Sequence, residues 1–163
     1  MKNRLIISLL LASIAAMAQD EHHKMVDHRG DQVMGFSHEK TTHHFRLFSD
    51  GGAIEVTAND QRDEESRAQI RMHLAHIAGM FTAGNFKAPM LIHDQTPPGV
   101  PTLQRLREQV TYRYEDIPGG GRVRIATRNA EAVLAVHQFL RFQIVDHRTG
   151  DTTEIGKETP GGK

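Results

Sequence analysis

Histidine and methionine are the residues in this sequence best suited to chemistry. The chain contains 11 histidines and 7 methionines and has no cysteine. Imidazole nitrogen suits copper, zinc and nickel, and thioether sulfur selects Cu(I). The lack of cysteine excludes disulfides, iron–sulfur clusters and cysteine-based zinc sites. Any metal chemistry must therefore come from histidine, methionine and carboxylate side chains.

The densest group of these residues lies in the segment VMGFSHEKTTHHF. It contains Met34, His38, His43 and His44. Because successive side chains of a strand point to opposite faces, His43 shares the face of Phe45, toward the core, whereas His44 faces solvent. We therefore expect His43 to be able to share a site with the helices. The alternative is that the adjacent pair is ordinary strand polarity near a sheet edge.

Two further histidines occupy matching places in an apparent internal repeat. Aligning IRMHLAHIAGMF with LAVHQFLRFQI places His73 over His137. Both positions fall on the apolar stripe of a predicted helix, so the two imidazoles could meet under a sheet and bind a metal, with His43 or His93 as a third ligand. Alternatively, each is a core histidine that is hydrogen-bonded to the backbone or to a tyrosine.

A row of soft side chains follows one face of the first predicted helix. Met72, His76 and Met80 stand four residues apart, and two ligands at this spacing can grip one ion. Methionine at helical spacing is also a common core filler. The row therefore supplies reserve ligands rather than a primary site.

Together these residues predict a non-catalytic metal-binding protein that acts as a carrier, buffer or sensor. Copper is the expected metal, with zinc as the second choice. The expected imidazole ligands are His43, His73 and His137. The reserve ligands are His38, His76, His93, Met80 and Met90. Neutral imidazole is the ligating form, so affinity is expected to fall as the pH drops through about 6.5.

Two other functions stay open. The free face of a sheet, or a cleft beneath a proline-rich connector, could engage a protein or a small molecule, with the histidines incidental. A metal-dependent enzyme with an open coordination position is the weaker alternative. No catalytic residue is predicted, because HLAH lacks the glutamate of HExxH and no serine stands in a nucleophile elbow.

Residues 1–18 have the three parts of a secretory signal peptide. Lys2 and Arg4 precede an apolar run, and Ala18 suits cleavage before Gln19. The run is too short for a comfortable membrane span, which needs roughly 20 residues. We expect a periplasmic or secreted protein with no membrane span after cleavage. Its partners would be a metal ion and a periplasmic protein, because a formal net charge of +0 gives no field that attracts nucleic acid.

The remaining sequence predicts one small domain of the α+β class, over residues 41–148. Segments 42–81 and 109–146 each contain two strands and then a helix. Two such ββα repeats predict a four-stranded antiparallel sheet with two helices packed on one face, related by an approximate two-fold axis. In the first hairpin, pairing about Asp50-Gly51 would place Leu47 opposite Ile54.

Three segments flank or interrupt these repeats. The polar arm 19–40 is expected to be extended or loosely ordered. The connector 82–108 contains four prolines that disfavour regular structure, apart from a short helix over Thr102–Arg107. The tail 149–163 is expected to be flexible.

Several long strings in the chain resemble those of a group of small secreted bacterial proteins. The strings are VMGFSHEKTTHHFRLFSDGGAIEVTAND, MLIHDQTPPGVP and HQFLRFQIVDHRTGD. Together with the intervening sequence they cover most of the chain after the signal. The resemblance implies export but brings no catalytic residues with it.

Overall fold

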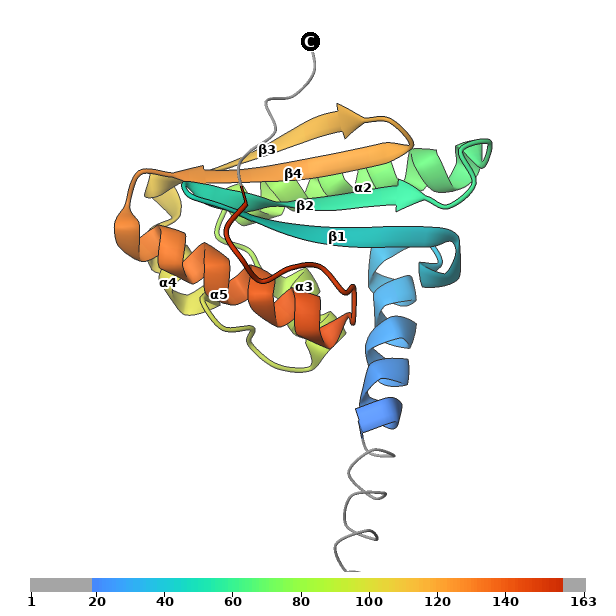
Figure 1. Cartoon of the computed structure of the whole chain (residues 1–163), viewed down its shortest axis with the longest axis horizontal. Helices are drawn as coiled ribbons and strands as arrows, with labels where there is room; N and C mark the ends of the chain where they lie inside the picture. The colour runs from blue at the N-terminus through green and yellow to red at the C-terminus, as the bar shows by residue number, and fades with distance from the viewer. Residues whose placement is uncertain (1–18, 157–163) are drawn as a thin grey trace, which may run out of the picture.

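The computed structural model describes residues 19–156, which form a four-stranded antiparallel sheet with helices packed beneath it (Figure 1). The strand order is β1-β2-β4-β3. After an N-terminal helix over residues 19–34, the elements are η1 (His38–Lys40), β1 (Thr41–Phe48), β2 (Gly51–Ala58), α2 (Glu64–Thr82), α3 (Lys87–His93), α4 (Val100–Arg105), η2 (Arg107–Gln109), β3 (Val110–Ile117), β4 (Gly120–Thr127) and α5 (Ala130–Asp146). The predicted α+β class and the two ββα units are confirmed. The predicted signal peptide, residues 1–18, lies outside the described residues.

The two long helices cover the same face of the sheet. Helix α2 lies under β3 and β4, and α5 lies under β1 and β2 (Figure 1). Both helices begin as the sequence indicates, because the side chains of Asp63 and Asn129 accept hydrogen bonds from backbone amides of the first turn. Their apolar stripes are buried against the sheet, as Leu74 and Leu140 illustrate. None of the helices among residues 19–156 is long and apolar enough to cross a membrane.

The first hairpin has the expected faces but a different register. Phe45 pairs with Ile54, and Leu47 pairs with Gly52 instead of Ile54. The sequence-based register was therefore wrong by two residues, which leaves every side chain on its predicted face. The hairpin closes at the Phe48–Gly51 pair, which leaves only Ser49 and Asp50 in the turn. A Cβ on Gly52 would come within 2.3 Å of Leu140 Cδ1 in α5. Only glycine fits at this place in β2.

Two segments that were expected to be irregular are helical. Residues 19–34 form a helix instead of an extended arm, and its apolar Val26 is completely buried. The connector contains α3, where regular structure was not expected, and α4, which begins two residues before the short helix predicted over Thr102–Arg107. Pro89 and Pro101 lie in the first turns of these helices. Backbone amides there have no partner within the helix, so proline removes no hydrogen bond.

The described part of the predicted tail is also ordered. Residues 149–156 run along the outer edge of β1 (Figure 1). The Asp151 carboxylate accepts a hydrogen bond from the backbone amide of Phe45 at 3.0 Å, and the Gly156 amide donates to the Leu47 carbonyl at 2.8 Å. The tail therefore contributes to the fold as far as Gly156.

Candidate functional site

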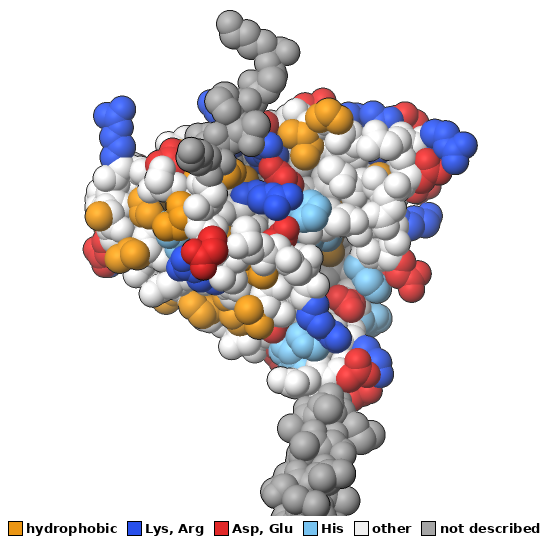
Figure 2. Space-filling model, viewed as in Figure 1, with side chains coloured by type: hydrophobic (Ala, Val, Ile, Leu, Met, Phe, Trp, Pro, Cys, Tyr) orange, Lys and Arg blue, Asp and Glu red, His pale blue; other side chains and the backbone are white. Residues whose placement is uncertain are grey.

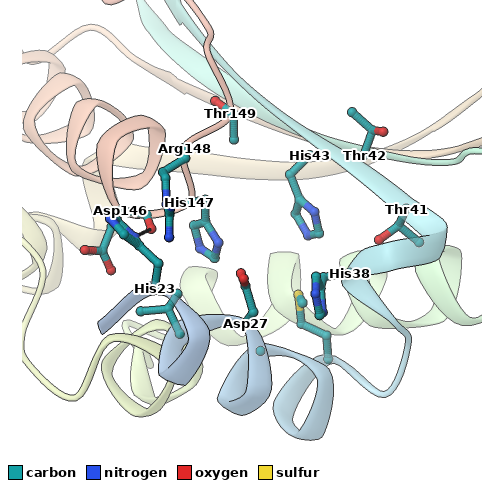
Figure 3. A pocket seen from close by; sticks show the side chains of 13 residues that line it. His23, Asp27, His38, Thr41, Thr42, His43, Asp146, His147, Arg148 and Thr149 are labelled. Carbon is teal, nitrogen blue, oxygen red and sulfur yellow. Dashed lines mark hydrogen bonds between the residues drawn. The ribbon is translucent and has the colours of Figure 1, made fainter. Parts of the chain in front are cut away.

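A cavity of about 460 Å³ lies where the N-terminal helix, the start of β1 and the end of α5 meet (Figure 3). Figure 2 shows histidine side chains gathered at this junction between the N-terminal helix and the rest of the protein. The side chains with metal-binding or acid–base chemistry that line the cavity include His23, Asp27, Met34, His38, His43 and His147. This cavity is the candidate functional site.

Two imidazoles face each other across this cavity (Figure 3). The rings of His43, on β1, and His147, immediately after α5, are parallel within 2° with centroids 5.9 Å apart. Phe36 stacks on His43 at 6.0 Å, and Phe45 stacks on His147 at 5.7 Å. Aromatic neighbours thus hold both rings in place. The placement of His43 agrees with the sequence analysis, whereas His147 was missed.

Burial keeps both imidazoles neutral. Desolvation, followed by the neighbouring histidines, lowers the pKa of His43 to about 4. The same causes lower the pKa of His147 to about 3. Both rings are therefore in the ligating form throughout the physiological range. The expected fall in affinity near pH 6.5 used the ordinary imidazole pKa, and these lowered values move the expected fall to more acidic pH.

Neither ring is hydrogen-bonded to any other residue in the part of the chain that the structure describes, and Nε2 of His43 is fully buried without a partner. Two other histidines that line the cavity do have hydrogen-bond partners. His38 is bonded through Nδ1 to both Asp31 carboxylate oxygens at 3.0 Å, and His23 is bonded through Nδ1 to the Asp146 carbonyl at 3.0 Å. A buried polar nitrogen without a partner costs stability, so such a nitrogen needs an explanation.

Met34 adds a soft atom to the two imidazoles. It lies at the end of the N-terminal helix and lines both the cavity and a smaller apolar pocket beside it, as do His43 and His147. A Cβ on Gly30 would approach Met34 Cε to 3.2 Å, so the absence of a side chain at Gly30 leaves room for the thioether. The sequence analysis named Met34 within the densest group but did not choose it as a ligand.

A buried network supports His147 from below. The His93 ring lies edge-on to His147, with centroids 4.9 Å apart. His93 is bonded through Nδ1 to the Asp146 carboxylate at 2.5 Å and through Nε2 to the Gln143 amide oxygen at 2.9 Å. The other carboxylate oxygen of Asp146 binds His22 at 2.8 Å. Burial alone would raise the pKa of Asp146, but hydrogen bonds from His22 and His93 outweigh it and lower the pKa below its usual value. His93 thus has a positioning role.

His137 lies outside the cavity. Its Nε2 is 2.8 Å from the Phe48 carbonyl and 3.1 Å from the Gly51 carbonyl, so the ring donates to the turn between β1 and β2. His73 lies at the opposite end of β1, edge-on to Phe36. The expected meeting of His73 and His137 therefore does not occur. A two-fold axis brings equivalent side chains together only where they lie on the axis, and these two lie away from it.

His73 remains close to the site. It lines the apolar pocket together with His43, and burial, followed by the charge of His76, lowers its pKa to about 4. Among the reserve ligands, His38 lines the cavity, whereas His76, His93, Met80 and Met90 line neither space. His76 is exposed on α2, Met80 packs against the core and Met90 is 37% exposed on α3.

Among residues 19–156, no group of three or more histidine and carboxylate side chains lies close enough to hold a metal ion. The expected site of three imidazoles is therefore not formed by these residues. The structure instead brings together two imidazoles and a thioether.

No family model, curated protein or solved structure matches the chain. The resemblance to small secreted bacterial proteins stays a prediction. The function must accordingly be argued from the geometry of the cavity.

Proposed function

We propose that the protein is an exported copper-binding protein that holds Cu(I) in the cavity, with His43, His147 and Met34 as ligands. The observation that carries the proposal is the pair of facing imidazoles: both are neutral and half-buried, neither has a hydrogen-bond partner among the described residues, and Nε2 of His43 is fully buried. Such nitrogens are available to a metal without the loss of another interaction.

The donor set favours Cu(I) over harder ions. Two imidazoles and a thioether are soft or borderline ligands, and thioether sulfur in particular selects Cu(I). Metal binding normally competes with protons for the ligands. Because burial lowers the pKa of both imidazoles, protons compete weakly here. A binding site of this kind suits a carrier, buffer or sensor.

His38 and His23 are suited to binding the ion on its way into such a site. Each has its Nδ1 bonded to an oxygen atom, which leaves Nε2 as the second ring nitrogen. This arrangement fixes the tautomer and orientation of metal-binding histidines in many proteins. Asp27 lies between them along the cavity wall (Figure 3). We infer that these residues receive the ion before it reaches the two inner imidazoles.

The size of the cavity favours a second candidate. A volume of about 460 Å³ exceeds the needs of one ion and falls within the range of small-molecule sites, roughly 300–1,000 Å³. Its walls also contain Thr41, Thr42, Thr149 and Arg148, which can bind a polar ligand. In that case the protein would be a small-ligand-binding module, and copper would bind with no dependence on His147.

Anaerobic titration tests the copper proposal. Cu(I) would be added to the protein in competition with a chromophoric chelator, and the variants H43L, H147L and M34L would be compared with H76A. We expect one ion per chain and an affinity that falls by at least about tenfold, or 1.4 kcal/mol, in each of the first three variants. The exposed His76 serves as the matched control and should leave the affinity unchanged.

The proposal is overturned if H43L and H147L, shown to be folded by circular dichroism, bind Cu(I) as tightly as the unaltered protein. Elemental analysis of protein purified from its own periplasm provides the complementary measurement, with copper as the expected metal.

A further inference from the structure

A small apolar pocket of about 60 Å³ lies beside the cavity, between the sheet and the helices. His43, His147 and Met34 separate the two spaces, because they line both. Most of the other walls of the pocket are aliphatic or aromatic, and they include Ile54 and Leu74. Aspartate, glutamate, lysine and arginine are absent from its lining, so the pocket suits an uncharged occupant.

Two buried polar nitrogens without hydrogen-bond partners line this pocket. One is Nε2 of His43, and the other is Nε2 of Gln143, a residue with only 4% of its surface exposed. Buried polar atoms are nearly always hydrogen-bonded, and each exception costs about 1–3 kcal/mol. Nε2 of His43 is the nitrogen available to copper, so the Gln143 amide is the group that points to an occupant able to accept a hydrogen bond.

The orientation of the Gln143 amide is fixed from outside the pocket. Its oxygen lies 2.9 Å from His93 Nε2, and His93 is itself bonded through Nδ1 to Asp146 at 2.5 Å. Both His93 nitrogens thus face oxygen atoms, and when the ring carries both protons its Nε2–H donates to the Gln143 amide oxygen, which leaves the NH₂ group of Gln143 to serve as a donor.

We infer that this pocket binds a small uncharged molecule of diatomic size, of which dioxygen is an example, and that Gln143 donates a hydrogen bond to it. The volume suits this class, since one water molecule in the liquid takes up about 30 Å³. The apolar walls disfavour a cluster of waters. This inference rests on the proposed function in one respect: His43 and Gln143 line the same pocket, so copper held by His43 would face the bound molecule.

Xenon tests the pocket without any metal. Metal-free protein would be equilibrated with xenon under pressure while methyl resonances are followed by nuclear magnetic resonance. We expect saturable shifts for Ile54, Leu74 and Ile77, which line the pocket, and none for Leu103, which is buried elsewhere. The inference is overturned if the lining methyls show no saturable shift, whatever the result with copper. The same absence of a shift is expected if tightly held water alone occupies the pocket.

Carbon monoxide tests the hydrogen bond from Gln143. Bound to Cu(I)-loaded protein, it should give a single C–O stretching band that moves to higher frequency in Q143L, because loss of the donor weakens polarisation of the bound molecule. Gln138, exposed on the same helix, provides the control variant Q138L, whose band should not move. An unmoved band in Q143L overturns the donor role. If no copper binds but xenon enters, the proposed function fails while the pocket inference stands.

Discussion

A histidine that was predicted as a ligand lies at each end of strand β1, His43 on the strand itself and His137 on α5, and the two differ in what their nitrogens contact. At the end of the strand, His137 donates to the carbonyls of Phe48 and Gly51. Near its start, His43 faces a cavity with a buried nitrogen that contacts no polar atom among the described residues. Both residues were predicted to lie on the apolar face of their element. The difference shows that a histidine's hydrogen-bond partners, more than its burial, separate a structural role from a binding role.

Acid should have the largest effect, and it should act on the cavity end. The folded pKa values of His43 and His147, about 4 and about 3, lie below the ordinary value of 6.5. The unfolded chain therefore takes up protons first, and stability falls as the pH drops from 6.5 to about 4. We expect a loss on the order of 4 kcal/mol from these two residues, measured by urea unfolding.

The double variant H43L/H147L should show a flatter dependence of stability on pH over the same range. A dependence as steep as that of the unaltered protein would contradict the assignment of this effect to His43 and His147.

Copper affinity should stay nearly constant down to about pH 4 and fall only below it, in contrast with the affinity of sites made of exposed histidine ligands.

Removal of the histidine at the turn should destabilise the protein without affecting copper. In H137L, two buried carbonyls lose their donor, and the free energy of unfolding should fall by about 3 kcal/mol. Urea unfolding measures the loss, and the chelator competition should give an unchanged Cu(I) affinity. A weakened copper affinity in folded H137L would break the distinction between the two ends of the strand.

Replacement of His43 at the cavity should have the opposite pattern, with little effect on stability and a large effect on copper affinity. In H43L, an apolar side chain of similar size replaces a ring with a buried unpaired nitrogen, so the free energy of unfolding should change by no more than about 1 kcal/mol. Cu(I) affinity should nevertheless fall by at least about tenfold. A large loss of stability in H43L would assign His43 a structural role like that of His137.

The smallest effect concerns the N-terminal helix that walls the cavity. His22 is 40% exposed in its side chain and binds an Asp146 oxygen that can also bind water. H22A should lower the free energy of unfolding by only about 0.5 kcal/mol. Hydrogen exchange of residues 19–34 should become faster while exchange in α5 stays unchanged. Equal protection in both proteins would show that His22 does not hold the helix.

The sequence predicted the faces of the strands better than the meeting of the helices. Alternation along β1 placed His43 toward the core, and this result is insensitive to the slip of two residues in the hairpin register. The contact between His73 and His137 could not be inferred from their matching positions, because it depended on where a two-fold axis passes. His147 lies three residues after Ile144, so helical spacing would extend the apolar stripe to it, but the predicted helix ended at residue 146.

The N-terminal helix escaped prediction because few of its residues are apolar. Val26 is the residue that anchors it, and its remaining contacts are polar, such as that between Arg29 and the Ile92 carbonyl at 2.7 Å. Met34 therefore gained a place in the candidate site only once the helix was seen. A signal was present in the sequence, since Val26 and Met34 lie eight residues apart on one helical face with Gly30 between them.

The segment 149–156 also shields the molecule from its own copies. An uncovered outer strand offers unpaired amides and carbonyls to the same strand of another chain, which leads to aggregation. Here Asp151 and Gly156 occupy those groups at Phe45 and Leu47. Proteolysis ahead of Asp151 would remove this cover and expose β1 to edge-to-edge association, so the intact C-terminal segment keeps the cavities of neighbouring molecules apart.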